Sequence, residues 1–272
     1  MGAILWTSFL LSGGSYLTAC ILFFTLARQR RATRLGPKWP ARLLGLGAAL
    51  QLVYLVLFSV VDRRCPVYSL HTALGIVSLV GVVTYVVLSR GRRLEALGGF
   101  VAASSAIFMV TAISLAGRPP EPNDRWLMAI HITSNLLGGG VLLIAGCAAA
   151  FYLWNEYRLR HRRVLGQGTR LPPLESLDGV VHRLLWIGVP LLTIGMLTGR
   201  LALRRLDVVT VGDKTRAALS TASWLLLLVV LALRQFARWR GRRPALVTLV
   251  GAVGIFTIIA LYVGRALLGG AL

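Results

Sequence analysis

Four histidines are the residues of this chain with the clearest capacity for chemistry. His71 and His131 each stand at the start of a long apolar run. Imidazole is the commonest metal ligand among side chains, and two imidazoles at one depth of a membrane could hold a single haem iron between them. We therefore predict His131 and His71 as candidate axial ligands of haem. The alternative for each is a polar residue at a helix entrance that reaches headgroups or water.

The other two histidines are predicted to lie at the opposite membrane face. His182 begins a different apolar run, so a bilayer thickness of roughly 30 Å separates it from the first pair, and it cannot share their iron. It is a candidate for a second, inner-face polar site, and we favour a polar contact with Glu156 or Asp178. His161 lies in a basic loop and is expected to be solvated.

Other chemistries have little support in the sequence. There is no Gly-rich phosphate loop, no H-E-x-x-H and no G-x-S-x-G motif. The three cysteines, Cys20, Cys65 and Cys147, form no C-x-x-C pair, which excludes the usual zinc and redox motifs. The few carboxylates fall near the ends of apolar runs, which argues against an intramembrane proton relay. We predict that the protein is not an enzyme and has no metal site beyond a haem iron.

The composition indicates that these residues belong to a membrane protein. The chain is 56% hydrophobic and 14% charged, with a mean hydropathy of +0.73, outside the range of soluble globular proteins. Its formal charge of +21 would suggest nucleic acid in a soluble protein. Here the arginines cluster between apolar runs, so topology and anionic headgroups explain them better, and we expect no nucleic-acid partner.

Eight membrane spans are predicted, which makes the chain an all-α polytopic membrane bundle and a single integral membrane domain over residues 1–272. Each span has about 20 residues, enough to cross roughly 30 Å of hydrocarbon. The first span follows no basic segment and is expected to be retained, not cleaved as a signal peptide. The spans lie at approximately 4–27, 41–61, 69–89, 97–117, 126–153, 180–203, 217–233 and 245–268.

The basic residues predict the orientation. The links after the first, third, fifth and seventh spans together carry most of the Arg and Lys residues. Because positive charge favours the cytoplasmic side, both termini are expected outside. The link between the sixth and seventh spans is also basic, although it falls on the outer side. The lipid bilayer itself is thus the first partner that the sequence implies.

Glycine and proline mark points of close helix contact. Gly195 and Gly199 form a G-x-x-x-G in the sixth span, and residues 138–140 are a glycine triplet in the fifth. Small residues allow helix backbones to approach closely within a membrane. Pro190 is predicted to kink the sixth span, which neighbouring helices can tolerate.

Several runs of residues resemble the cytochrome c assembly membrane protein family, in its short eight-span branch of HemX-like or YpjD-like proteins. The similarity covers residues 126–264. It lies in H-I-T-S-N-L-L-G-G-G-V-L-L-I-A-G from His131, P-P-L-E-S-L-D before the sixth span, I-G-V-P-L-L-T-I-G-M-L-T-G from Ile187, Asp213-Lys214, Ser223-Trp224 and W-R-G-R-R from Trp239.

The resemblance implies a bacterial inner-membrane bundle that handles haem for c-type cytochromes and works beside a second membrane subunit. In the family, an outer loop rich in tryptophan and ending in W-D-P-K binds haem, flanked by histidine ligands. That loop aligns with residues 206–216, where Asp213 and Lys214 keep its acidic-basic end but the tryptophans and the proline are missing. His131 matches the first outer histidine. The second has no counterpart in G-R-A-L-L-G-G near the chain's end, and His71 is our candidate substitute.

The outer link also supplies candidates for contacts to haem propionates. Arginine binds carboxylates through paired hydrogen bonds. These candidates are Arg200, Arg204, Arg205, Asp213 and Lys214. The alternative function is a non-catalytic scaffold or regulator of haem metabolism that kept the fold and lost the ligand site. A small-solute transporter is a third class, supported by Pro190 and the glycine-rich turns alone.

Overall fold

A computed structural model describes residues 2–28, 39–62, 67, 69–90, 94–114, 125–160, 173–203 and 211–267. Within these ranges every regular element is a helix, which confirms the all-α prediction. Seven helices are long and apolar enough to cross a membrane, and the fourth contributes a shorter apolar stretch, Leu97–Ile113. The helices are α1 (Gly2–Arg28), α2 (Trp39–Asp62), α3 (Leu70–Ser89), α4 (Glu95–Ile113), α5 (Arg125–Arg160), α6 (Leu174–Leu203), α7 (Val211–Phe236) and α8 (Arg242–Leu267).

Several helices extend beyond the predicted spans. Helix α5 continues to Arg160, and α6 begins at Leu174, directly after Pro173. Hydropathy marks only the apolar part of a helix, whereas backbone hydrogen bonding continues into its polar ends. Helix α7 likewise begins at Val211. This corrects the prediction of a polar link that holds Asp213 and Lys214, because both residues lie in the first turn of α7.

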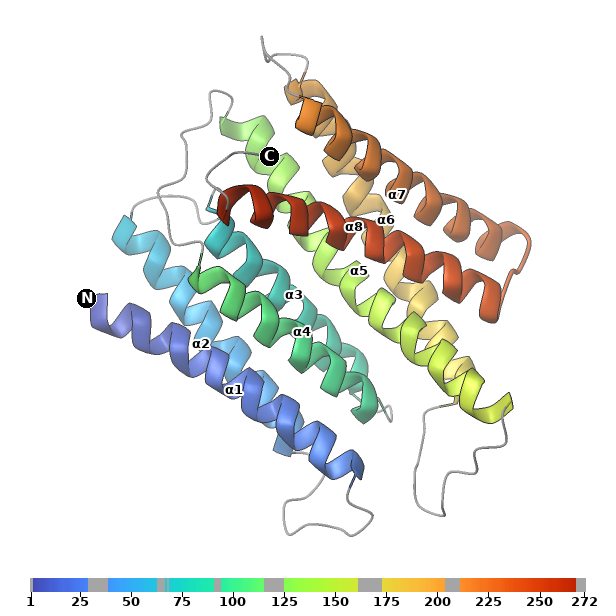
Figure 1. Cartoon of the computed structure of the whole chain (residues 1–272), viewed down its shortest axis with the longest axis horizontal. Coiled ribbons are helices and arrows are strands. Elements are labelled where there is room, and N and C mark those ends of the chain that lie inside the picture. The colour runs from blue at the N-terminus through green and yellow to red at the C-terminus, as the bar shows by residue number, and fades with distance from the viewer. Residues whose placement is uncertain are drawn as a thin grey trace.

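The helices form two groups of four, shown in Figure 1. Helices α1 to α4 pack chiefly among themselves, and so do α5 to α8. The groups are joined where α5 runs beside α3 and, to a smaller extent, α4. The start of α1 and the end of α8 lie at the same end of the bundle, as an even number of antiparallel crossings requires.

Buried hydrogen bonds hold the first group together. The side chain of Gln51 on α2 is fully buried, accepts a hydrogen bond from the Tyr16 hydroxyl on α1 (2.6 Å) and donates to the Gly75 carbonyl on α3 (2.8 Å). Lipid cannot replace water as a hydrogen-bond partner, so polar groups within a bundle are satisfied between helices. The same Nε2 donates to the Met109 Sδ on α4 (3.2 Å), so Gln51 links all four helices of this group.

Helix α5 is the central helix of the second group, and its small residues let neighbours approach its backbone. A side chain at Gly140 would place its Cβ 2.8 Å from the Val80 Cβ and 3.0 Å from the Val77 carbonyl oxygen, both on α3. On another face of α5, a Cβ at Gly138 would lie 3.2 Å from Leu191 and from Leu192 of α6. The predicted close approach is thus confirmed at two positions of the glycine triplet. At Gly139 a Cβ would meet nothing within 4 Å.

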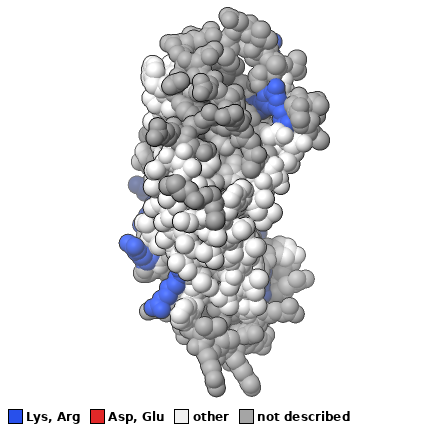
Figure 2. All heavy atoms as spheres, turned by 90° about the vertical axis from the view of Figure 1, so that its left-hand side faces the viewer, with Lys and Arg blue, Asp and Glu red and all other residues white. Residues whose placement is uncertain are grey.

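The surface has the apolar character that a bilayer requires. Large hydrophobic side chains are exposed along the helices, among them Leu10, Leu52, Val110, Ile194 and Val253. Figure 2 looks onto the side of the molecule that is at the left in Figure 1, where most of the described surface is uncharged. The chain is a multi-pass membrane protein, with the lipid bilayer as its surrounding medium.

The contact between α3 and α5 predicts that alanine substitutions at two adjacent glycines differ strongly in their effect on stability. Gly140→Ala should destabilise the protein by about 1–3 kcal/mol, because the new methyl group meets the Val80 Cβ and a backbone oxygen, neither of which can move alone. Gly139→Ala should leave stability unchanged or raise it, since alanine favours helix and has open space there. Thermal unfolding in detergent measures both variants. Equal midpoints for the two would contradict this packing.

Candidate functional site

His131 is held against the backbone of α6 by one hydrogen bond. It lies in the second turn of α5, half-buried, with its Nδ1 2.7 Å from the Gly195 carbonyl oxygen. A carbonyl can only accept, so we assign the proton to Nδ1, which donates to it. Nε2 then carries a lone pair, and among the residues that the structure describes it has no hydrogen-bond partner. The imidazole is therefore oriented through one nitrogen and open at the other.

Asn135 supports this arrangement one turn further along α5. Its Nδ2 donates to the His131 backbone carbonyl at 2.7 Å. The same nitrogen lies 3.2 Å from the His131 Nδ1, but with Nδ1 protonated both groups are donors and no bond forms there. Sequence reasoning missed Asn135, although its spacing of four residues from His131 places it on the same helix face.

The two glycines of the G-x-x-x-G make the space that these side chains fill. A Cβ at Gly199 would lie 2.5 Å from the His131 Nδ1, and one at Gly195 would lie 2.6 Å from the Asn135 Oδ1. The imidazole thus rests on a helix surface that has no side chain beneath it. The predicted close helix contact is present, and the side chains that pack on the two glycines are the His131 ring and the Asn135 amide.

The geometry at His131 is that of an oriented metal ligand. Histidines that bind metals usually donate the other ring nitrogen to a carbonyl or carboxylate, which fixes the tautomer and the direction of the lone pair. No cluster of three His, Cys, Asp or Glu side chains occurs within the described ranges. A lone imidazole suits an iron that brings four nitrogen donors of its own, as haem iron does. The residues present therefore fit haem as an axial ligand.

His71 is placed very differently. Its ring is 5% exposed and stacks on Phe9 of α1, with the ring centroids 5.1 Å apart. Its Nδ1 lies 2.6 Å from the Ala112 carbonyl oxygen, and its Nε2 lies 2.5 Å from the Tyr54 hydroxyl. Nδ1–H donates to the carbonyl, and Nε2 accepts from the tyrosine. Both nitrogens are thus engaged, as the alternative of a satisfied polar residue requires.

The two imidazoles share a depth in the bundle but not a site. Gly140 packs against Val80, and the two histidines each lie nine residues before that contact on parallel helices. The partners of His71 come from α1, α2 and α4, whereas His131 faces α6. Joint ligation of one iron stays a prediction, and the hydrogen bonds of His71 do not support it.

Two of the side chains predicted to contact haem propionates lie within the described part of the chain, and their role stays a prediction. Arg200 directly follows Gly199, is exposed, and places its Nη2 3.4 Å from the Thr221 Oγ1 of α7. Lys214 is exposed at the start of α7. Arg204, Arg205 and the side chain of Asp213 lie outside the described residues. Two cations therefore accompany His131 at this end of the second group.

Arg216, which lies in the same segment, packs against a neighbouring helix. Its side chain is buried, with the guanidinium carbon 4.7 Å above the ring of Tyr262 on α8. An arginine over an aromatic face is stabilised by the ring quadrupole. Arg216 thus joins α7 to α8 near the end where Arg200 and Lys214 are exposed.

At the opposite end, arginines bind both carboxylates that were predicted for His182. The Asp178 Oδ1 lies 3.0 Å from the Arg234 Nη2 of α7, an ion pair without hydrogen-bond alignment. The Glu156 Oε1 lies 2.7 Å from the Arg160 Nη2. Each carboxylate thus has an arginine as its ion-pair partner, and the favoured contact of His182 with Glu156 or Asp178 stays a prediction. Arg234 is far from Asp178 in sequence, so spacing along the chain could not reveal the pair.

Comparisons with known proteins agree with the architecture. The sequence profile of a family described as cytochrome C assembly protein matches residues 41–270. The inner membrane protein YpjD of Escherichia coli strain K12 is 32% identical over 126 residues, which is 46% of this chain and 47% of that protein. The cytochrome c biogenesis protein CcsA of Nostoc punctiforme is 24% identical over 208 residues, or 73% of this chain and 56% of that protein.

A second CcsA, from Chlamydomonas reinhardtii, is 24% identical over 151 residues, which is 55% of this chain and 40% of that protein. The matches thus span about half the length of the curated relatives. No solved structure matches this chain.

The fit between His131 and Gly199 predicts a dependence between two substitutions. Gly199→Ala should destabilise the protein by about 1–3 kcal/mol, because the methyl group takes the place of the imidazole. In a His131→Ala background that penalty should largely vanish, since no ring remains to displace. Unfolding of the four proteins in the cycle measures the coupling. Additive effects would show that the ring does not rest on Gly199.

The ion pair at the other end predicts that neutralising two carboxylates has unequal effects on stability. Asp178→Asn should cost about 3–5 kcal/mol, because it leaves the buried Arg234 guanidinium unpaired. Glu156→Gln is the matched control and should cost less than ~1 kcal/mol, since its partner Arg160 is mostly exposed. Denaturant or thermal unfolding distinguishes them, and similar losses would mean that Arg234 finds another partner.

Proposed function

This chain belongs to the cytochrome c assembly protein family, and we propose that it handles haem in cytochrome c biogenesis, with His131 as an axial ligand. The observation that carries the proposal is the open Nε2 of an imidazole whose Nδ1 is fixed on the Gly195 carbonyl. The similarity to proteins named for cytochrome c biogenesis supports the cofactor class. The membrane is proposed to be the bacterial cytoplasmic membrane, in line with the relative named an inner membrane protein.

The chain's own residues have three tasks in this proposal. His131 binds the iron through Nε2, and the Gly195 carbonyl strengthens that bond because it accepts the Nδ1 proton. Asn135 holds the α5 backbone at the ligand. Arg200 and Lys214 supply positive charge at the same end, where carboxylates of the macrocycle would find hydrogen-bond donors. Arg204, Arg205 and Asp213 remain candidates for that role.

Haem, if bound, would supply an iron that accepts an imidazole nitrogen as a ligand. The described residues offer one open imidazole at this end, because both nitrogens of His71 are engaged. We propose that the chain binds and presents the cofactor and is not itself an enzyme. A second membrane subunit or a haem-accepting partner would then provide the other axial ligand.

A scaffold without a cofactor is the second candidate. The engaged nitrogens of His71 and the missing tryptophans of the outer segment favour it. It differs from the first candidate in one respect: assembly with partners would not depend on the His131 imidazole.

The test is the haem content of the purified protein. Wild-type protein from haem-replete cells should show a haem absorption band, and His131→Ala should lose at least about 90% of it, since the one imidazole that the described residues fix at Nδ1 and leave without a partner at Nε2 is gone. His182→Ala removes an imidazole from the opposite end and should leave the band unchanged. A colourless wild-type protein would refute haem binding.

A further variant separates ligation from folding. His131→Gly leaves a hole at the imidazole position, and added imidazole should restore the haem absorption band. If His131→Ala instead kept the full band, another residue would be the ligand. If the wild-type protein contained no haem and His131→Ala assembled with partners as the wild type does, the scaffold would be the correct function.

A further inference from the structure

We propose that a hollow at the start of α6 binds the anionic headgroup of a phospholipid, whose acyl chains lie along the same helix. The hollow has a volume of about 390 Å³ and is lined by Pro173, Glu175, Ser176, Gly179 and Arg183. It lies at the predicted cytoplasmic end of the bundle, where the described chain enters its sixth membrane span. It is remote from His131, and the proposal is independent of haem.

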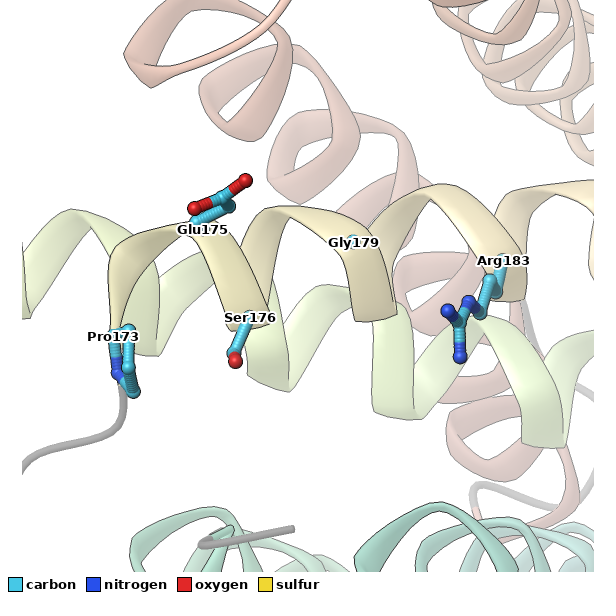
Figure 3. A pocket seen from close by; sticks show the side chains of 5 residues that line it. All are labelled: Pro173, Glu175, Ser176, Gly179 and Arg183. Atoms are coloured by element: carbon cyan, nitrogen blue, oxygen red, sulfur yellow. The ribbon is translucent and has the colours of Figure 1, made fainter.

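The side chains around the hollow separate by charge. Figure 3 shows Ser176 and Arg183 on one side of α6 and the Glu175 carboxylate turned to the other. The Arg183 side chain is exposed and has no ion-pair or hydrogen-bond partner among the described residues. A hydroxyl and a guanidinium on one face offer several donors to a phosphate, and the carboxylate of Glu175, which also lines the hollow, is turned away from both.

Gly179 makes the hollow. It lies one turn after Ser176 and one turn before Arg183, and a Cβ at this position would meet no atom within 4 Å. No neighbouring helix therefore requires glycine here. A side chain at position 179 would stand between the two polar groups, so the glycine keeps open the space that a headgroup would use.

The surface below the hollow suits acyl chains. The helical spacing of three or four residues places Arg183 above an exposed apolar stripe on the same face. Trp186 is 48% exposed, and tryptophan favours the depth of the lipid headgroups. The remaining members of the stripe are Ile187, Pro190, Ile194 and Leu197.

A phospholipid fits the polar hollow and the apolar stripe beside it better than a free phosphate does. Its phosphate would meet Arg183 and Ser176, and its chains would cover the stripe that continues from them. The preference for an anionic lipid follows from the charge of Arg183 in the hollow, to which Arg240, Arg242 and Arg243 at the same predicted end add a general attraction. Basic side chains at the cytoplasmic face attract acidic lipids.

Native mass spectrometry of the whole chain in a neutral detergent tests the proposal with phosphatidylglycerol and phosphatidylcholine as probes. Wild-type protein should retain phosphatidylglycerol about 10-fold better than phosphatidylcholine, and Arg183→Gln should remove that difference. Arg242→Gln is the matched control, an exposed arginine at the same end but outside the hollow, and should keep it. Gly179→Leu should fill the hollow and weaken binding without disturbing the helix, because leucine favours helix.

Three results would overturn the proposal. Equal effects of Arg183→Gln and Arg242→Gln would indicate attraction by net charge alone. Retention of both lipids to the same extent would show that the headgroup is not recognised. Displacement of the lipid by millimolar inorganic phosphate would show that the hollow takes a free anion and that the apolar stripe contributes nothing.

Discussion

The structure depends on how closely other helices approach the backbone of α5. On one face of α5, Gly140 brings α3 so near that a single methyl group would collide with Val80 and with a carbonyl oxygen. On another face, Leu142 packs on Gly188 of α6, and further along Gly146 meets Ala252 of α8. Within lipid, hydrophobic burial does not drive helices together, so packing at short range must do so. Helix α5 therefore joins the two groups and also orders the second.

The same constraint fixes the candidate site. Because α5 and α6 lie so close, the imidazole of His131 can reach a backbone carbonyl and rest on bare glycine. A larger residue at position 199 would separate the ring from its acceptor. The glycines that permit helix contact thus also orient the His131 imidazole near the end of the bundle, so a change in the packing there also changes the position of this ring.

The sequence predicted the fold well, because length and hydropathy determine which segments can cross a bilayer. It located the helices but not their ends, since polar turns such as those at Arg160 and Asp213 continue the helix outside the apolar part. It predicted that Gly195 and Gly199 face a neighbour, because small residues at that spacing permit contact. It could not identify what they face, nor the partner of Asp178, since these depend on which helices are adjacent.

The two histidines at one depth show where sequence reasoning stops. Each begins an apolar run, and nothing in the neighbouring residues distinguishes them. In the fold, Tyr54 and the Ala112 carbonyl engage both nitrogens of His71, whereas α6 offers His131 only one carbonyl and a surface without side chains. A histidine whose two nitrogens are satisfied stabilises a core and has no lone pair to give. One that is fixed through Nδ1 and open at Nε2 is prepared to bind, so the capacity for ligation belongs to the surroundings of the residue and not to its type.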